Sequence, residues 1–136
     1  MRMRSSAFAV VLAAGIAACG PPGPMSLDGV TILRHKPLSA SPAALFTGTV
    51  HFRDGCVWGD LDGTGEAQVM VWPPDSRLEH RDGRLVLVVD AVVLTDGDGF
   101  SIGGGQEPIE FIRELAGPIP DECLADLYWL GSDINP

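Results

Sequence analysis

The stretch LFTGTVHFRDGCVW, from Leu45 to Trp58, decides the fold because its side chains alternate in character residue by residue. One set is small or apolar (Phe46, Gly48, Val50 and Phe52), and the other is polar (Thr47, Thr49, His51 and Arg53). A period of two predicts a strand with one buried and one solvated face. The pair Asp54-Gly55 is a preferred two-residue hairpin turn. We therefore expect Cys56–Trp58 to return as the partner strand.

Further short strands follow, separated by turns rich in Asp and Gly. The expected strands are Ala67–Trp72, Leu85–Leu94, Phe100–Ile102 and Leu124–Leu130. The Val-rich run Leu85–Leu94 predicts a central strand buried on much of both faces. Asp90, which interrupts it, is expected at a bulge or facing solvent. Gly103–Gly105 permits positive φ and a close approach of backbones.

One late helix is predicted over Pro108–Ala116, because its apolar residues recur at helical spacing and Gly117-Pro118 would stop it. Five or six short strands with a single helix favour an all-β fold, a small closed or nearly closed OB-like barrel. A small β-sandwich is the alternative.

The first nineteen residues predict export. Arg2 and Arg4 precede an uncharged run, Ala7–Ala18, that is shorter than a membrane-spanning helix. The run ends in Ile16-Ala17-Ala18-Cys19, which resembles the lipobox of bacterial lipoproteins. The resemblance implies a signal peptide over residues 1–18, cleavage before Cys19, a diacylglycerol group on its thiol and an acylated amine. An ordinary signal peptide cut at an A-x-A site is the alternative.

After the signal, residues 19–44 are rich in Pro, Ser and Ala and are expected to form a tether, with strand character only at 29–33. The barrel domain is then expected over residues 45–136.

The charge balance restricts the possible partners. The whole chain carries a formal charge of −9, and loss of Arg2 and Arg4 with the signal leaves seven basic and 18 acidic residues, or −11. Such a surface repels phosphate backbones, so nucleic acid is not expected as a partner. The sequence has no polybasic patch for anionic lipid, and membrane contact is expected through the acyl chains.

With Cys19 acylated, Cys56 and Cys123 are left as a pair. Two remaining cysteines in an exported protein predict a disulfide. A metal or redox site built on these cysteines is the weaker alternative, because the chain has no C-x-x-C motif.

Two candidate ligand sites can be weighed against plainer interpretations. Asp60 and Asp62 begin a pattern similar to a calcium loop, but Val71 stands where the bidentate Glu belongs, and Asp96 and Asp98 add carboxylates in a second turn. Ordinary turns explain the same residues. Trp58, Trp72 and Trp129, with Tyr128, are candidates for an aromatic ligand groove, although in a small barrel such residues are more often core.

No catalytic motif is present, and His35, His51 and His80 lack metal-type spacing and are expected at the surface. We expect no catalytic residues and no cofactor. Four features, in this order, resemble a family of small bacterial secreted proteins and lipoproteins over roughly Thr47–Gly131: Gly55-Cys56, Val71-Trp72-Pro73, Gly103-Gly104-Gly105 and Cys123. That resemblance implies the fold and the disulfide, and assigns no site.

The sequence thus predicts a membrane-anchored lipoprotein of the bacterial envelope, facing the periplasm or the exterior, whose barrel binds or scaffolds another envelope protein or a glycan. The alternatives are an envelope hydrolase with an acidic site and a calcium-dependent binding module.

Overall fold

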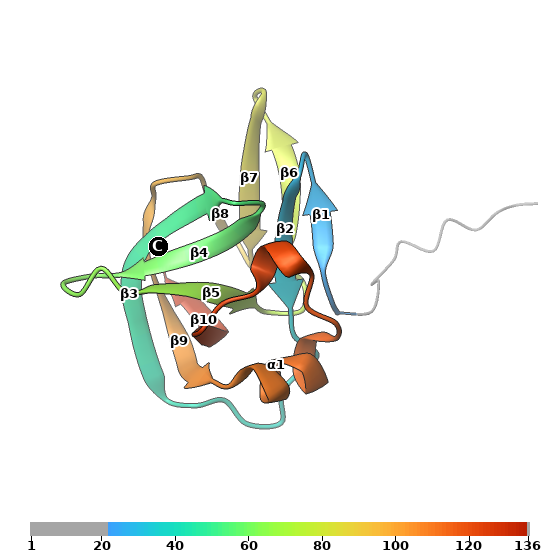
Figure 1. Ribbon diagram of the computed structural model, residues 1–136. Helices are drawn as coiled ribbons and strands as arrows, with labels where there is room; N and C mark the ends of the chain where they lie inside the picture. The colour runs from blue at the N-terminus through green and yellow to red at the C-terminus, as the bar shows by residue number, and fades with distance from the viewer. Residues whose placement is uncertain (1–21, 136) are drawn as a thin grey trace, which may run out of the picture.

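The computed structural model describes residues 22–135, which form ten strands, one α-helix and one 3₁₀ turn (Figure 1). In chain order these are β1 (Met25–Leu27), β2 (Val30–Arg34), β3 (Ala44–Arg53), β4 (Cys56–Leu61), β5 (Ala67–Trp72), β6 (Arg77–Arg81), β7 (Arg84–Val89), β8 (Val92–Leu94), β9 (Gly99–Glu107), α1 (Ile109–Ala116), η1 (Asp121–Cys123) and β10 (Tyr128–Asn135).

The main sheet closes on itself. Strand β3 pairs antiparallel with β4 and β9, β4 with β5, and β9 with β10, and a parallel pairing of β10 with β5 completes the ring. Strand β2 enters where β4 and β5 separate, with Thr31 opposite Cys56 and Leu33 opposite Val71, both in parallel register. The predicted five- to six-stranded all-β barrel is confirmed.

The barrel interior is filled by the apolar side of the alternating pattern. Phe46 stacks on Phe100 with 5.6 Å between ring centroids, and Trp129 lies 5.4 Å from Phe46. Gly59 faces the same interior, where an added β-carbon would lie 2.7 Å from the Met70 sulfur and 2.9 Å from the Phe46 ring. Glycine at this position therefore leaves the space that the Phe46 ring occupies.

The predicted long strand over Leu85–Leu94 is wrong. The run is split into β7 and β8, which pair with each other. Strand β7 also pairs with β6, and the three strands form a separate sheet. Asp90 adopts a left-handed conformation at φ 53° and lies exposed in the turn between β7 and β8. The run Leu85–Leu94 is apolar because residues of this small sheet, including Leu87 and Val89, pack against the barrel core.

The outside of β4, β5 and β10 is covered by the segment between β9 and β10. Ile112 and Ala116 of α1, with Cys123 of η1, pack against Val69 and Val71. Cys56 and Cys123 form the predicted disulfide, which joins β4 to η1. The predicted helix is confirmed at Ile109–Ala116, and Gly117 ends it at φ 77° with its N–H bonded to the Arg113 carbonyl.

The expected tether over residues 19–44 needs correction. The short hairpin β1–β2, turned at Asp28-Gly29, belongs to the folded body, and Ile32 and Leu33 are fully buried. The strand expected at 29–33 is thus part of the closed sheet rather than an attachment at its edge. The folded domain begins well before Leu45.

Candidate functional site

The predicted aromatic groove is not assembled. Trp72 and Trp129 belong to the barrel core, and Tyr128 is buried beneath the α1 segment, where burial raises the pKa of its hydroxyl. That hydroxyl donates to the Cys123 carbonyl at 2.9 Å and accepts from the Ala125 N–H at 3.0 Å. Trp58 alone among the three candidate tryptophans lies half-buried on the outside of the barrel.

A polar group does gather on the outer face of β3 and β4. The hairpin register places His51 opposite Trp58 and Thr49 opposite Asp60, and the alternation of β3 turns His51 and Arg53 outward. Asp96, in the turn between β8 and β9, reaches the same place, where its carboxylate accepts from the Phe52 N–H at 3.0 Å. We call His51, Arg53, Trp58, Asp60 and Asp96 the His51 cluster.

The imidazole of His51 stands between two carboxylates. Its Nε2 lies 3.2 Å from Asp60 Oδ2, and its Nδ1 lies 3.6 Å from Asp96 Oδ1. The side chains of His51, Asp60 and Asp96 are 34%, 29% and 58% exposed, so all three reach solvent.

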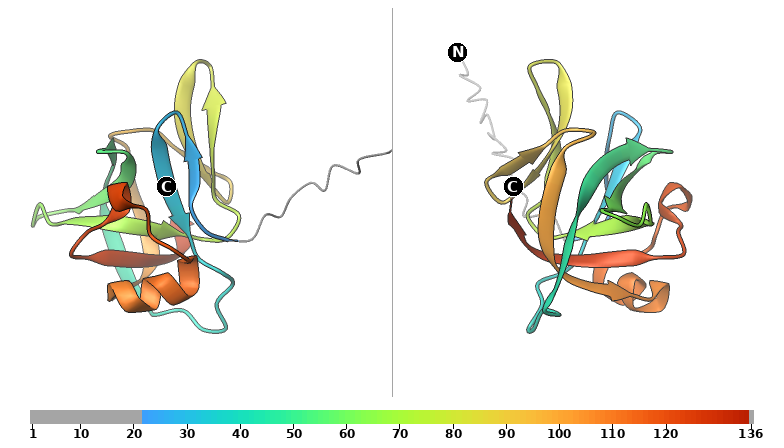
Figure 2. Two further views of the ribbon diagram at one scale, coloured as in Figure 1. Left: turned by 45° about the vertical axis from the view of Figure 1, so that its right-hand side comes forward. Right: turned by 90° about the vertical axis from the view of Figure 1, so that its left-hand side faces the viewer.

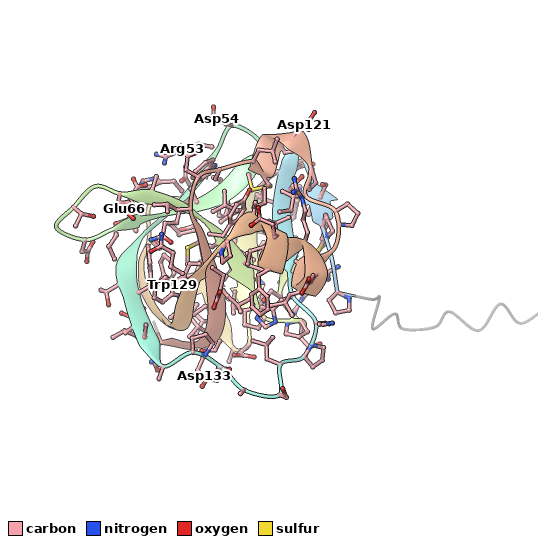
Figure 3. All side chains as sticks on the ribbon, turned by 60° about the horizontal axis from the view of Figure 1, so that its bottom comes forward. Arg53, Asp54, Glu66, Asp121, Trp129 and Asp133 are labelled. Atoms are coloured by element: carbon pink, nitrogen blue, oxygen red, sulfur yellow. A yellow bond between two sulfur atoms is a disulfide. The ribbon has the colours of Figure 1, made fainter. Side chains whose placement is uncertain are left out.

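Arg53 completes the cluster (Figure 3). Its guanidinium donates to Asp60 Oδ1 at 3.1 Å and lies 5.4 Å from the centre of the Trp58 ring. Pairs this exposed contribute only about 0–1 kcal/mol each to stability, and a cation–π contact at such a site about 0.5–1 kcal/mol. The arrangement therefore does little for folding, and it brings five side chains into contact at the surface.

The calcium candidates are only partly brought together. Asp60 and Asp96 meet at His51, whereas both bonds made by Asp98 go to Thr95, at 2.8 Å to its N–H and 2.9 Å to its hydroxyl. Asp62 lies exposed in the turn after β4. Within residues 22–135 no group of three or more His, Cys, Asp or Glu side chains is placed to hold a metal ion.

Among the described residues, the His51 cluster lacks the arrangement of a histidine general base beside a hydroxyl or thiol nucleophile, which is a different site from the acidic one of the hydrolase alternative. A general base needs a free nitrogen within hydrogen-bond reach of the nucleophile's proton. Both nitrogens of His51 face carboxylates. In the part of the chain that the structure describes, no Ser, Thr or Cys side chain is hydrogen-bonded to this imidazole. What the cluster presents to solvent is a set of carboxylates, an imidazole and a guanidinium.

The other two histidines differ from each other. His80 is exposed on β6 and pairs with Asp28. His35 is buried, contrary to the expectation of a surface residue: its Nε2 lies 2.6 Å from the Gly131 carbonyl oxygen and its Nδ1 lies 2.8 Å from that of Lys36. His35 therefore links the end of β2 to β10.

A second charged group lies on β6. Glu79 accepts hydrogen bonds from Arg81 and Arg77, and these bonds hold the pKa of its carboxyl below the ordinary value. It has no aromatic partner and no histidine between carboxylates. The Glu79 group is therefore a suitable control for the His51 cluster.

Comparison with known proteins gives no relative: no protein-family model, curated protein or solved structure matches this chain. None of the helices within residues 22–135 has the length and apolar character needed to span a bilayer. Cys19 and the signal peptide predicted over residues 1–18 lie outside the described residues.

Proposed function

We propose that this protein is a lipid-anchored component of the bacterial cell envelope whose barrel binds another envelope component through the His51 cluster. The observation that carries the binding role is the arrangement of His51 between Asp60 and Asp96, beside an arginine stacked on Trp58. The anchor rests on the lipobox ending at Cys19.

The cluster is suited to binding because its side chains already hold one another in place. Ordering flexible side chains on association costs free energy, about 0.5–1.5 kcal/mol for each one immobilised. Paired side chains avoid part of that cost. The exposed carboxylates and the guanidinium offer acceptors and donors to a hydroxyl-rich glycan or to a polar protein surface.

The disulfide supports a location outside the cytoplasm. The Cys56–Cys123 disulfide joins two elements of one domain, and such bonds persist in the oxidising compartments outside the cytoplasm.

The anchor is tested by the intact mass of the protein purified from its host's membranes. A chain that begins at Cys19 and carries acyl groups is expected. An unmodified chain would remove the anchor from the proposal.

The binding role is tested by co-isolation from native envelopes after chemical cross-linking. The variant His51→Ala/Arg53→Ala should lose the partners that the wild type retains. The matched control, Arg77→Ala/Arg81→Ala, removes two charged side chains from the Glu79 group and should keep them. Equal retention by both variants would contradict a binding role for the His51 cluster.

A further inference from the structure

The folded body begins almost directly after the predicted anchor. Gly23 is buried, and its carbonyl accepts a hydrogen bond of 3.1 Å from Arg34 Nε. A β-carbon at Gly23 would lie 3.7 Å from the carbonyl oxygen of Ala116, at the end of α1. The chain is therefore held against the domain from Gly23 onward, four residues after Cys19.

Four residues give little reach. At about 3.3–3.6 Å per residue, the Cα atoms of Cys19 and Gly23 can be separated by at most about 14 Å. Part of that length is taken up by the headgroup layer, because a bilayer of about 40–45 Å holds a hydrocarbon core of only about 30 Å. A domain of this size has a radius of gyration of about 13 Å, so the linker is shorter than the domain is wide.

We propose that the anchored domain rests on the phospholipid headgroups by one fixed face, the surface around the point where buried Gly23 meets the end of α1 at Ala116. Half-buried Arg34 and exposed Lys36 lie at this point. We call this surface the exit face. The inference rests on the lipidation of Cys19 in the proposed function. The N–H of Lys36 donates to the Leu115 carbonyl at 2.8 Å, and this bond places Lys36 beside the end of α1.

The short linker, rather than charge attraction, imposes this seating. The mature chain is acidic, at −11, and lacks a polybasic patch. Acyl chains in the membrane hold Cys19 in place, and the contacts of Gly23 then hold the exit face close by.

The seating also orients the candidate site. The described chain begins next to β1, whereas the turn between β4 and β5 lies on the opposite side of the barrel (Figures 1 and 2). Arg53 also lies away from the start of the described chain (Figure 3). The His51 cluster, to which Arg53 belongs, thus lies outside the exit face, where an envelope partner can reach it.

The single lysine of the chain makes a direct test possible. Once the amine of Cys19 is acylated, Lys36 holds the sole primary amine, and it is exposed on the exit face. The acylated protein is placed in vesicles of phosphatidylcholine and phosphatidylglycerol, whose headgroups contain no primary amine. Lys36 is then labelled with an active ester carrying either a long poly(ethylene glycol) chain or a small acetyl group.

Two variants provide the comparison. One carries about 20 Gly and Ser residues between Gly20 and Pro21, a spacer with a mean reach of about 25 Å. The other, Lys36→Arg/Glu66→Lys, moves the amine to the exposed turn on the far side (Figure 3).

We expect the long reagent to label Lys36 several-fold more slowly in the native chain than in the spacer variant, while the small reagent labels both at the same rate. The amine at position 66 should react with the long reagent equally fast in the chain with the spacer and in the chain without it. If the long reagent labels Lys36 equally fast with and without the spacer in acylated protein, the seating is wrong and the anchor stands. If the mass shows no acyl group on Cys19, the anchor and the seating both fail, whereas the binding role of the His51 cluster keeps its own test.

Discussion

The outside of the barrel has two halves that differ in what covers them. The outer face of β4, β5 and β10 is closed by α1 and η1, which bury an apolar layer and fasten it with the Cys56–Cys123 disulfide. The outer face of β3 and the adjoining part of β4 has no such cover and carries the His51 cluster. The first half accounts for much of the stability outside the barrel interior, and the second is free to meet a partner.

The largest predicted effect lies in the covered half. Replacing both cysteines, Cys56→Ala/Cys123→Ala, releases a loop of 67 residues in sequence. The loop-closure model gives a loss of about 4 kcal/mol in the free energy of unfolding, as an upper figure. Urea denaturation measures it, with reduced wild type as the control. An unchanged midpoint would show that the disulfide does not hold the cover in place.

The helix offers a matched pair of substitutions for the next effect. Ile112 is fully buried against the covered face, whereas its neighbour Phe111 is 39% exposed. Ile112→Ala should cost about 2–5 kcal/mol, because it leaves a cavity. Phe111→Ala should cost clearly less in the same denaturation experiment. A reversed order would mean that α1 packs through its other side.

On the open half, substitutions should abolish binding while leaving stability almost unchanged. His51→Ala or Arg53→Ala should each change the free energy of unfolding by less than about 1 kcal/mol, because exposed pairs contribute little. The same variants should lose the envelope partner. A larger loss of stability would place the cluster among the structural elements of the fold.

The smallest effect concerns Glu79. Its folded-state pKa is lowered by bonds from Arg81 and Arg77, so its carboxylate stabilises the fold above the unfolded pKa, and this contribution is lost as the pH falls through the folded pKa. Glu79→Gln should lower Tm slightly at pH 7, and the difference from wild type should vanish in strong acid. Melting curves at both pH values measure it, and a difference that persists in acid would contradict the ion-pair explanation.

Sequence alone predicts the elements whose signals are local. The alternation in β3 and the turn at Asp54-Gly55 correctly predicted the β3–β4 hairpin, because one of its faces is buried and the other solvated. The turn at Asp90-Ala91 escaped prediction, since Asp90 adopts positive φ without a glycine after it. The place of strand β2 in the closed sheet was not predicted, because its partners there, β4 and β5, are parallel strands later in the chain and its flanks are rich in proline.

Only part of the candidate site could be predicted from the sequence. A two-residue turn at 54–55 fixes the register that sets His51 opposite Trp58 and Thr49 opposite Asp60, so this half of the cluster follows from the hairpin. Asp96 arrives from a turn after β8, and only the closed barrel brings it there. His35 is similar, because its Nε2 bonds to Gly131, 96 residues away.

The most direct test of the open face is site-specific photo-crosslinking in native envelopes. A photoreactive residue in place of Thr49, on β3 beside the His51 cluster, is compared with one in place of Glu114, exposed on α1. The same discrete adduct should form at position 49, disappear in the His51→Ala/Arg53→Ala background, and be absent at position 114. Adducts at position 114 with none at position 49 would show that the partner binds over the covered half, and would contradict the account.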